Sequence, residues 1–173
     1  MIGKKEGRTP LHIAKNLRGS WKHFRVIWEA KELWIWGGRS DGECFISSIV
    51  GKNEQRHFRF SGGAKTLTWS RDGSKICLIG FGGDLAIIDT LEPEIRLTVI
   101  PGKWRKIDVS KNGKRLAAID YKNNLAIFEL SNLTEPLKLE LDYPPSMIQW
   151  FEDGLIYCNV VGELKMFNTE GHI

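Results

Sequence analysis

The sequence is poor in cysteine, which limits the covalent and metal chemistry open to the protein. Its 173 residues include only three cysteines, Cys44, Cys77 and Cys158, which are widely separated and form no C-x-x-C pair. A disulfide framework needs an even set of cysteines, and a structural zinc site needs paired ligands. We interpret the three as free thiols in a reducing compartment. We therefore expect a cytoplasmic protein without a metal or other cofactor.

The sequence also lacks a long apolar run and a strong excess of one charge. No stretch approaches the ~18 consecutive apolar residues of a membrane-spanning helix. The segment Leu11–Ala14, which follows a basic start, is too short for a signal peptide. Twenty-five Lys and Arg against 21 Asp and Glu leave a net charge of only +4. This weak excess disfavours nucleic acid as a partner, and we expect no membrane partner.

Signatures of the common enzyme classes are missing as well. There is no H-E-x-x-H, no G-x-S-x-G and no phosphate-binding G-x-x-x-x-G-K-[ST]. Gly80–Asp84 is rich in glycine, but it joins two apolar segments, whereas a phosphate loop leads into a helix. The four histidines, His12, His23, His57 and His172, are too far apart to form a recognisable metal motif. We expect no catalytic residues and no enzymatic activity.

The sequence does contain a repeat of about 40 residues, the period expected for a unit of four strands. Residues 69–79 align with residues 109–119, so that Gly73 and Gly113 lie 40 positions apart. Leu85–Asp89 aligns with Leu125–Glu129 at the same spacing. A further copy occupies 150–158 and 164–167, and a degenerate first copy begins at 26–36, with Phe45 placed 40 positions before Leu85.

Polarity within each repeat predicts strands with different environments. The second segment is a nearly unbroken apolar run, typical of a strand buried on both faces: Leu33–Trp36, Ile76–Ile79, Leu116–Ile119 and Leu155–Cys158. The last segment alternates, typical of a strand with one wet face: His57–Phe60, Ile95–Val99 and Leu137–Leu141. Hairpin pairs such as Asp72-Gly73 and Asn112-Gly113 separate the segments. No helical stripe is present, so the chain is predicted to be all-β.

Over about residues 20–170 these repeats resemble the WD-repeat β-propeller family. Each carries a Ser-x-Asp/Asn-Gly type of turn between apolar strands, and a later Leu-x-Ile-Ile/Phe-Asp/Glu segment. The repeats are degenerate, because the Trp-Asp position holds Ile88-Asp89, Phe128-Glu129 or Phe167-Asn168, and no Gly-His pair opens a repeat. The resemblance implies four-stranded antiparallel blades around an axis, but not the family's buried His/Ser/Asp/Trp network.

We therefore predict an all-β β-propeller of four four-stranded antiparallel blades. An N-terminal segment is expected at 1–18, and the repeats at about 19–61, 62–101, 102–142 and 143–173. The last repeat ends after its third strand, and we expect Thr9–Ala14 to close it as the outer strand and protect its edge. Three assemblies fit: a closed four-bladed ring, an eight-bladed homodimer exchanging N-terminal strands, and part of a longer propeller.

The connections from each outer strand to the next inner strand are expected to gather at one end of the ring. They carry aromatic residues among basic ones, which suit a binding face for an acidic or extended protein segment. The predicted partner-binding residues are Trp21, Lys22, Lys65, Lys103, Trp104, Arg105 and Tyr143. In the alternative interpretation, the tryptophans pack onto the ends of the sheets and the lysines solvate the rim.

Two polar residues, Asp108 and Gln149, occupy the predicted innermost strands. There they would line a solvated central channel or hold an ion or small polar ligand. Together with the missing catalytic motifs, the repeats favour a non-enzymatic scaffold that binds other proteins or forms part of a larger assembly. The alternatives are a propeller that stacks nucleic-acid bases on its basic and aromatic loops, and one that binds a small ligand at the channel mouth.

Overall fold

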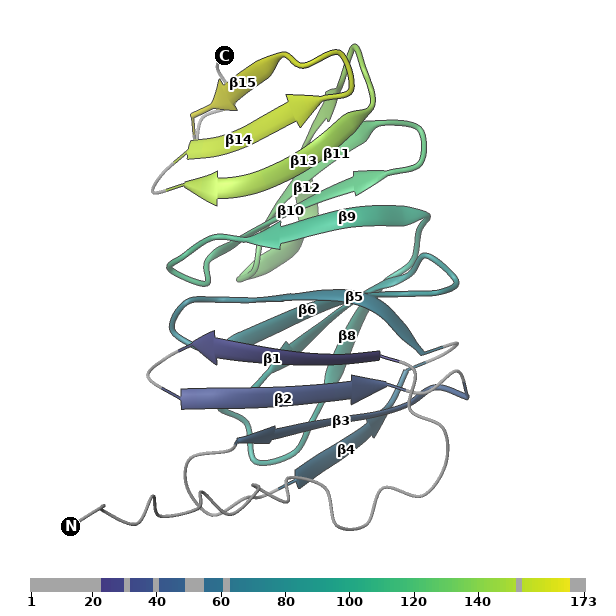
Figure 1. The fold of residues 1–173 in the computed structure, drawn as a ribbon, viewed down its shortest axis with the longest axis vertical. Helices are drawn as coiled ribbons and strands as arrows, with labels where there is room; N and C mark the ends of the chain where they lie inside the picture. Colours follow the sequence, from purple (N-terminus) through teal and green to yellow (C-terminus); the bar gives the residue numbers. More distant parts are fainter. Residues whose placement is uncertain are drawn as a thin grey trace, which may run out of the picture.

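The computed structural model describes residues 23–29, 32–38, 41–48, 55–60, 63–151 and 154–168 (Figure 1). All regular elements in these ranges are β-strands, and they contain no helix. The strands form four antiparallel sheets, and within each sheet the spatial order is the chain order. The prediction of an all-β chain of antiparallel sheets is confirmed.

Each sheet is a simple meander. The first contains β1 (His23–Glu29), β2 (Glu32–Gly38), β3 (Glu43–Ser48) and β4 (Gln55–Arg59). The second contains β5 (Ala64–Trp69), β6 (Lys75–Gly80), β7 (Leu85–Asp89) and β8 (Leu97–Ile100). The third contains β9 (Trp104–Val109), β10 (Arg115–Asp120), β11 (Asn124–Glu129) and β12 (Asn132–Glu140). The fourth contains β13 (Pro145–Phe151), β14 (Gly154–Asn159) and β15 (Leu164–Phe167).

The turn between the first and second strands has the same hydrogen bond and backbone geometry in the second and third sheets. Ser70 Oγ accepts a hydrogen bond from Lys75 N–H at 2.9 Å, and Ser110 Oγ accepts one from Arg115 N–H at 2.9 Å. The glycine of each turn has a positive φ, 73° at Gly73 and 66° at position 113. Glycine reaches this region without steric cost, so the Ser-x-Asp/Asn-Gly pattern encodes the turn locally.

The sheets stack face to face in chain order, from the first at the bottom of Figure 1 to the fourth at the top. Successive residues of a strand point to opposite faces, so each middle sheet packs against both neighbours. On β6, Leu78 contacts the first sheet's apolar cluster and Ile79 the third sheet's, and both are fully buried. Burial on both faces is thus confirmed for β6, and β10 is buried in the same way. It fails for β14, where Ile156 and Cys158 are only half-buried.

In the first repeat, the residue that corresponds to Leu85 lies one position earlier than the sequence alignment placed it. Gly42 and Gly83 both have φ above +90° in equivalent turns, which makes Cys44 the counterpart of Leu85. Cys44 faces the second sheet, just as Leu85 faces the third. The alignment of Phe45 with Leu85 was wrong. A shift of one residue moves a strand's side chains to the other face.

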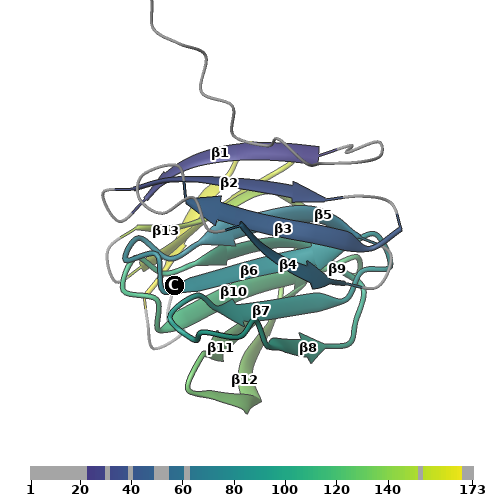
Figure 2. The same ribbon diagram turned by 90° about the horizontal axis from the view of Figure 1, so that it is seen from below.

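The four sheets do not close into a ring among the described residues. The first and fourth sheets lie at opposite ends of the stack in Figure 1, and the view along the stack in Figure 2 has the first sheet in front of the others. The fourth sheet has three described strands, so the edge of β15 has no further strand on it there. The predicted closing strand, Thr9–Ala14, lies outside the described residues.

Candidate functional site

Two kinds of connection meet at one end of the stack, which we call the loop end (on the right in Figure 1). One kind joins a sheet to the next, and the other joins the second and third strands of a sheet. They are tied together in three sheets by the same backbone hydrogen bond. Its donors are the N–H groups of Phe81, Tyr121 and Val160, and its acceptors the carbonyls of Gly63, Lys103 and Pro144, at 3.2, 3.0 and 3.1 Å respectively.

The loop end carries basic side chains whose hydrogen bonds go to neutral oxygens. Lys65 Nζ donates to Tyr121 Oη at 3.1 Å, and Lys103 Nζ donates to a backbone carbonyl at 3.0 Å. Arg105 donates to a backbone carbonyl and to the Asn123 side chain at 3.0 and 2.7 Å. Lys106 Nζ donates to the Ser146 carbonyl at 2.7 Å. In the described part of the chain, none of these four side chains forms an ion pair with a carboxylate.

A shallow groove runs between these cations along β5, β9 and β13, the first strands of the second, third and fourth sheets. It has a volume of about 300 Å³ and is lined from three sheets, by Lys65 and Thr66, by Arg105, Lys106 and Ile107, and by Ser146, Met147 and Ile148. Its walls combine charged ends with apolar stems. A groove of this kind suits an extended chain with acidic groups better than it suits an enclosed small molecule.

Exposed apolar residues flank this groove at equivalent positions of successive repeats. Phe81, Tyr121 and Val160 each begin the turn after the second strand, and 53%, 60% and 62% of their surfaces are exposed. The Lys65 ammonium lies 5.8 Å from the centre of the Tyr121 ring. The sequence analysis missed these three residues, although the 40-residue period would have aligned them.

The predicted partner-binding residues do not all lie on this surface. Lys65, Lys103 and Tyr143 are exposed at the loop end, and Arg105 is half-buried there. Trp21 and Lys22 lie outside the described residues.

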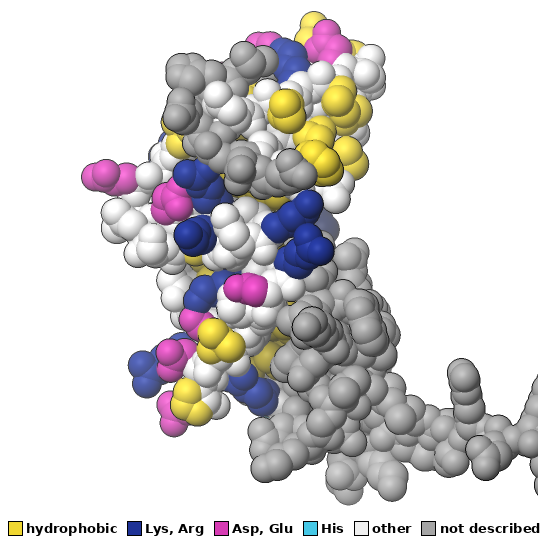
Figure 3. Space-filling model, turned by 90° about the vertical axis from the view of Figure 1, so that its left-hand side faces the viewer, with side chains coloured by type: hydrophobic (Ala, Val, Ile, Leu, Met, Phe, Trp, Pro, Cys, Tyr) yellow, Lys and Arg dark blue, Asp and Glu magenta, His cyan; other side chains and the backbone are white. Residues whose placement is uncertain are grey.

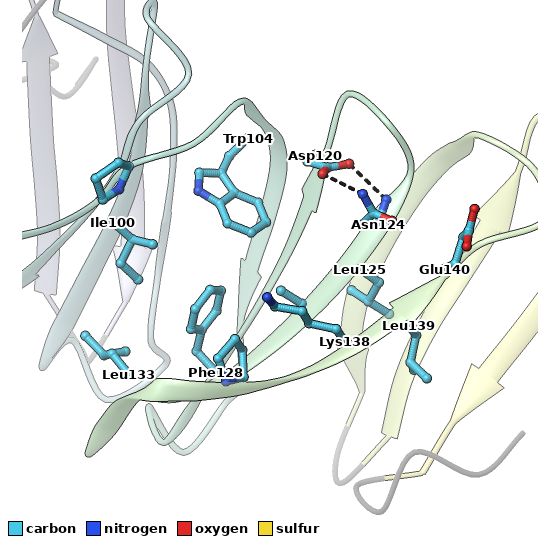
Figure 4. Close-up of a pocket in the computed structure, with 13 residues that line it drawn as sticks. Ile100, Trp104, Asp120, Asn124, Leu125, Phe128, Leu133, Lys138, Leu139 and Glu140 are labelled. Carbon is cyan, nitrogen blue, oxygen red and sulfur yellow. Dashed lines mark hydrogen bonds between the residues drawn. The ribbon is translucent and has the colours of Figure 1, made fainter.

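Trp104 lies instead in the wedge between the second and third sheets, in a pocket of about 550 Å³ (Figure 4). Its ring meets Phe128 edge to face, with centroids 5.8 Å apart and planes at 75°. Ile100 and Leu133 line the same pocket. The buried indole N–H of Trp104 has no hydrogen-bond partner. Trp104 is thus half-buried between two sheets, a position that neither interpretation of the sequence described, and its ring contributes to the contact between these sheets.

Asp108, on β9, connects the first strands of three sheets, β5, β9 and β13. Its carboxylate accepts hydrogen bonds from Thr68 Oγ1 on β5 at 3.0 Å and from Trp150 N–H on β13 at 2.7 Å. Its own carbonyl accepts a hydrogen bond from the Trp150 indole at 3.1 Å. Burial raises the pKa of Asp108, and the hydrogen bonds from Trp150 and Thr68 only partly offset this. Both carboxylate oxygens are therefore engaged by the protein itself.

Gln149, the second residue predicted to line a channel, is exposed on β13. No group of three or more His, Cys, Asp or Glu residues in the described ranges is arranged to hold a metal ion. Nor does the described part of the chain include a helix long and apolar enough to cross a membrane.

Comparisons by sequence found neither a matching family model nor a matching curated protein. Comparison with solved structures did find similar chains. The β-propeller domain of Cps50 (Swd1) from Myceliophteria thermophila aligns with a TM-score of 0.65 and 17% identity, over 83% of this chain and 52% of that one. A chain of the mitotic checkpoint complex aligns at 0.67 and 14%, over 85% and 48%.

These alignments, with the four stacked meanders, decide the fold. It is a β-propeller. The sheets are its blades, and the chain spans about half the length of those two neighbours. A third similar structure is the dihydro-heme d1 dehydrogenase NirN in complex with DHE. It aligns with a TM-score of 0.66 and 11% identity, over 90% of this chain and 36% of that one.

Proposed function

We propose that this propeller is a non-enzymatic scaffold or complex subunit that binds an acidic, extended segment of another protein across its loop end. The observation that carries the proposal is a set of four cations, Lys65, Lys103, Arg105 and Lys106, that have no carboxylate partner among the described residues. They lie beside exposed apolar residues that repeat from blade to blade. Cations bound only to neutral oxygens can take carboxylates without first breaking an ion pair. Hydrogen bonds in which the donor or the acceptor is ionised are about twice as strong as those between neutral groups, so each added bond to a carboxylate would be a strong one.

The apolar positions complement the charges. Tyr121 is more than half exposed and is held by Lys65, so it presents a fixed aromatic face at little entropic cost. Aromatic side chains and arginine dominate binding energy at protein interfaces. Tyr121, Tyr143 and Arg105 are therefore the residues expected to contribute most. Lys65, Lys103 and Lys106 would steer an acidic segment into the groove.

The structural neighbours support a scaffold role in general terms. One is a chain of an assembly, the mitotic checkpoint complex, and one is a separate propeller domain. The third is named as a dehydrogenase, so the fold by itself is compatible with catalysis. We propose a non-enzymatic role because the described loop end presents binding groups and no nucleophile paired with a base.

We further propose that Thr9–Ala14 forms the outer strand of the fourth blade. The described edge of β15, Leu164–Phe167, has no strand beyond it, and an unpaired edge promotes aggregation. Removal of residues 1–18 would then increase aggregation of the purified protein. Unchanged solubility and stability after this truncation would argue against the strand.

Partner capture with matched variants tests the binding face. The double variant Lys65→Glu, Tyr121→Ala changes two exposed residues of the loop end. The control, Lys111→Glu with Leu91→Ala, changes an exposed lysine and an exposed apolar residue away from the loop end. Proteins from the source cells that bind specifically to the wild type should be lost with the first variant and kept with the control. Equal recovery by both variants would refute the loop-end site.

Binding of single-stranded DNA at low salt would instead favour the nucleic-acid alternative.

A further inference from the structure

The outer face of the fourth blade has the composition of a packing surface. We call it the trailing face, because it points away from the third blade. Its residues alternate along the strands with those that pack on the third blade, and they form three cross-strand rows. The rows are Met147, Cys158 and Leu164; Gln149, Ile156 and Met166; and Phe151 with Gly154. Six of these eight residues are apolar, and Figure 3 shows hydrophobic side chains gathered at this end of the molecule.

Equivalent positions in the preceding blades are buried. Leu85 and Leu125 follow the positive-φ turn residue by two positions, as Leu164 does, and both have no exposed surface. Leu164 itself is 67% exposed. Two residues further along, Ile87 and Ile127 are each 8% exposed, but Met166 is 57% exposed. In the second and third blades these positions are covered by the next blade in the stack.

The same positions thus carry the same kind of side chain and differ only in whether a blade covers them. Patches of this type on a monomer mark an interaction site. The chemistry of the occupant follows from the two covered examples. It is a β-sheet that presents a row of apolar side chains at blade spacing.

We infer that a second copy of this chain supplies that sheet, so that two copies complete one propeller. The aligned part of this chain spans 52% and 48% of two similar propeller chains and 36% of a third, so two copies of it span about the length of either of the first two. The blades of this chain already pack against apolar faces of this kind at each interface between neighbouring blades. Two copies related by a two-fold axis, with the first blade of each following the fourth of the other, form a closed ring of eight blades.

Solution mass and surface variants test this inference. Sedimentation or light scattering of the intact chain should give about 39 kDa, twice the 19.7 kDa of one copy. Leu164→Lys and Met166→Lys should each shift the mass to that of one copy, because a lysine on this face cannot pack against an apolar sheet. Leu91→Lys alters a residue that is 78% exposed outside the trailing face, and it should leave the dimer intact. Circular dichroism should match the wild type in all three variants, because the changed residues are exposed in one copy.

Cys158 provides an independent measurement in the unaltered protein. It lies on the trailing face, so the dimer should slow its alkylation, and Met166→Lys should restore the rate. A wild type with the mass of one copy would overturn the inference, and a different polypeptide would then have to cover the trailing face. A dimer that survives both lysine substitutions would also overturn it, as would open-ended oligomers in place of a closed pair. The inference does not depend on the loop-end proposal, because Leu164 and Met166 lie outside the loop-end groove, and Lys65 and Tyr121 lie outside the trailing face.

Discussion

The carboxylate of Asp108 accepts a hydrogen bond from the backbone N–H of Trp150 at 2.7 Å, and the Trp150 indole donates to the Asp108 carbonyl at 3.1 Å. This reciprocal pair joins the inner strands of two blades 42 positions apart in sequence. Thr68 extends the link to a third blade. A side chain that sequence reasoning placed in a channel is therefore part of the contact between blades.

Asp108→Ala should destabilise the fold by about 2–3 kcal/mol, because it leaves donors on two neighbouring blades without an acceptor. Thr68→Val removes only one of these bonds and should cost about 1 kcal/mol. Urea unfolding of both variants measures the difference. The control is Glu135→Ala on β12, which alters an exposed side chain outside the trailing face and should change stability by less than about 0.5 kcal/mol. If Glu135→Ala costs as much as Asp108→Ala, Asp108 does not link the blades.

The Asp120 carboxylate should make stability depend on acid pH. Partial burial tends to raise the pKa of Asp120, but hydrogen bonds from Asn124 and from the Lys122 N–H outweigh it and hold the pKa below its usual value. Because the folded pKa is the lower one, this stabilisation is complete above the unfolded pKa and is lost as the pH falls through the folded pKa.

Asp120→Asn should therefore cost about 1 kcal/mol near pH 7, and the difference from the wild type should shrink from about pH 4 downward. Urea unfolding at several pH values measures it. Asp142→Asn serves as the control, since that carboxylate is exposed and lies 3.4 Å from the Lys165 ammonium. A pH-independent cost of Asp120→Asn would contradict the predicted role of its charge.

Gly113 should tolerate alanine less well than Gly162 does. Both have a positive φ, +66° and +88°, so both variants incur the backbone cost of about 1 kcal/mol. A Cβ at position 113 would also lie 3.2 Å from Ser70 Cβ and 3.3 Å from an Asp72 oxygen, whereas one at position 162 would meet nothing within 4 Å. We expect a total of about 2 kcal/mol for Gly113→Ala. Equal melting temperatures for the two variants would show that the turns of adjacent blades are not in close contact.

Trp104 should respond differently to phenylalanine and to alanine. Phenylalanine keeps a ring against Phe128 and removes the indole N–H that has no partner, so Trp104→Phe should change stability by less than about 1 kcal/mol. Trp104→Ala empties the wedge and should cost about 3 kcal/mol. Chemical denaturation distinguishes the two. A large loss with phenylalanine would imply that the N–H has a partner in solution.

The thiols should differ in reactivity. Burial raises the pKa of Cys44 to about 11 and that of Cys77 to about 12, so neither forms the nucleophilic thiolate near pH 8. Cys158 is only half-buried. Alkylation followed by mass spectrometry should modify Cys158 first, at a rate that the trailing-face contact controls. Prior modification of Cys77 in folded protein would contradict its burial.

Local patterns made much of the fold predictable. Ser70 and Gly73 specify a turn through bonds within six residues, and the run Ile76–Ile79 specifies a strand buried on both faces. The same reasoning missed Tyr121 and Phe81, because an exposed aromatic residue in a turn resembles ordinary loop sequence until the repeats are superposed. It also placed Trp104 at a partner surface, because the sequence does not show which way a side chain at a strand end turns.

The sequence by itself determined the all-β class, the 40-residue unit and the turns, since each depends on residues close together in the chain. Only the tertiary structure decided which faces are covered. Leu125 and Leu164 occupy equivalent positions, yet the first is buried and the second exposed, because burial depends on whether another sheet lies above. The structure likewise revealed Asp108 as a bond between blades, since its partners are some 40 residues away in either direction. Contacts between residues far apart in the chain depend on tertiary packing, so local sequence patterns do not predict them.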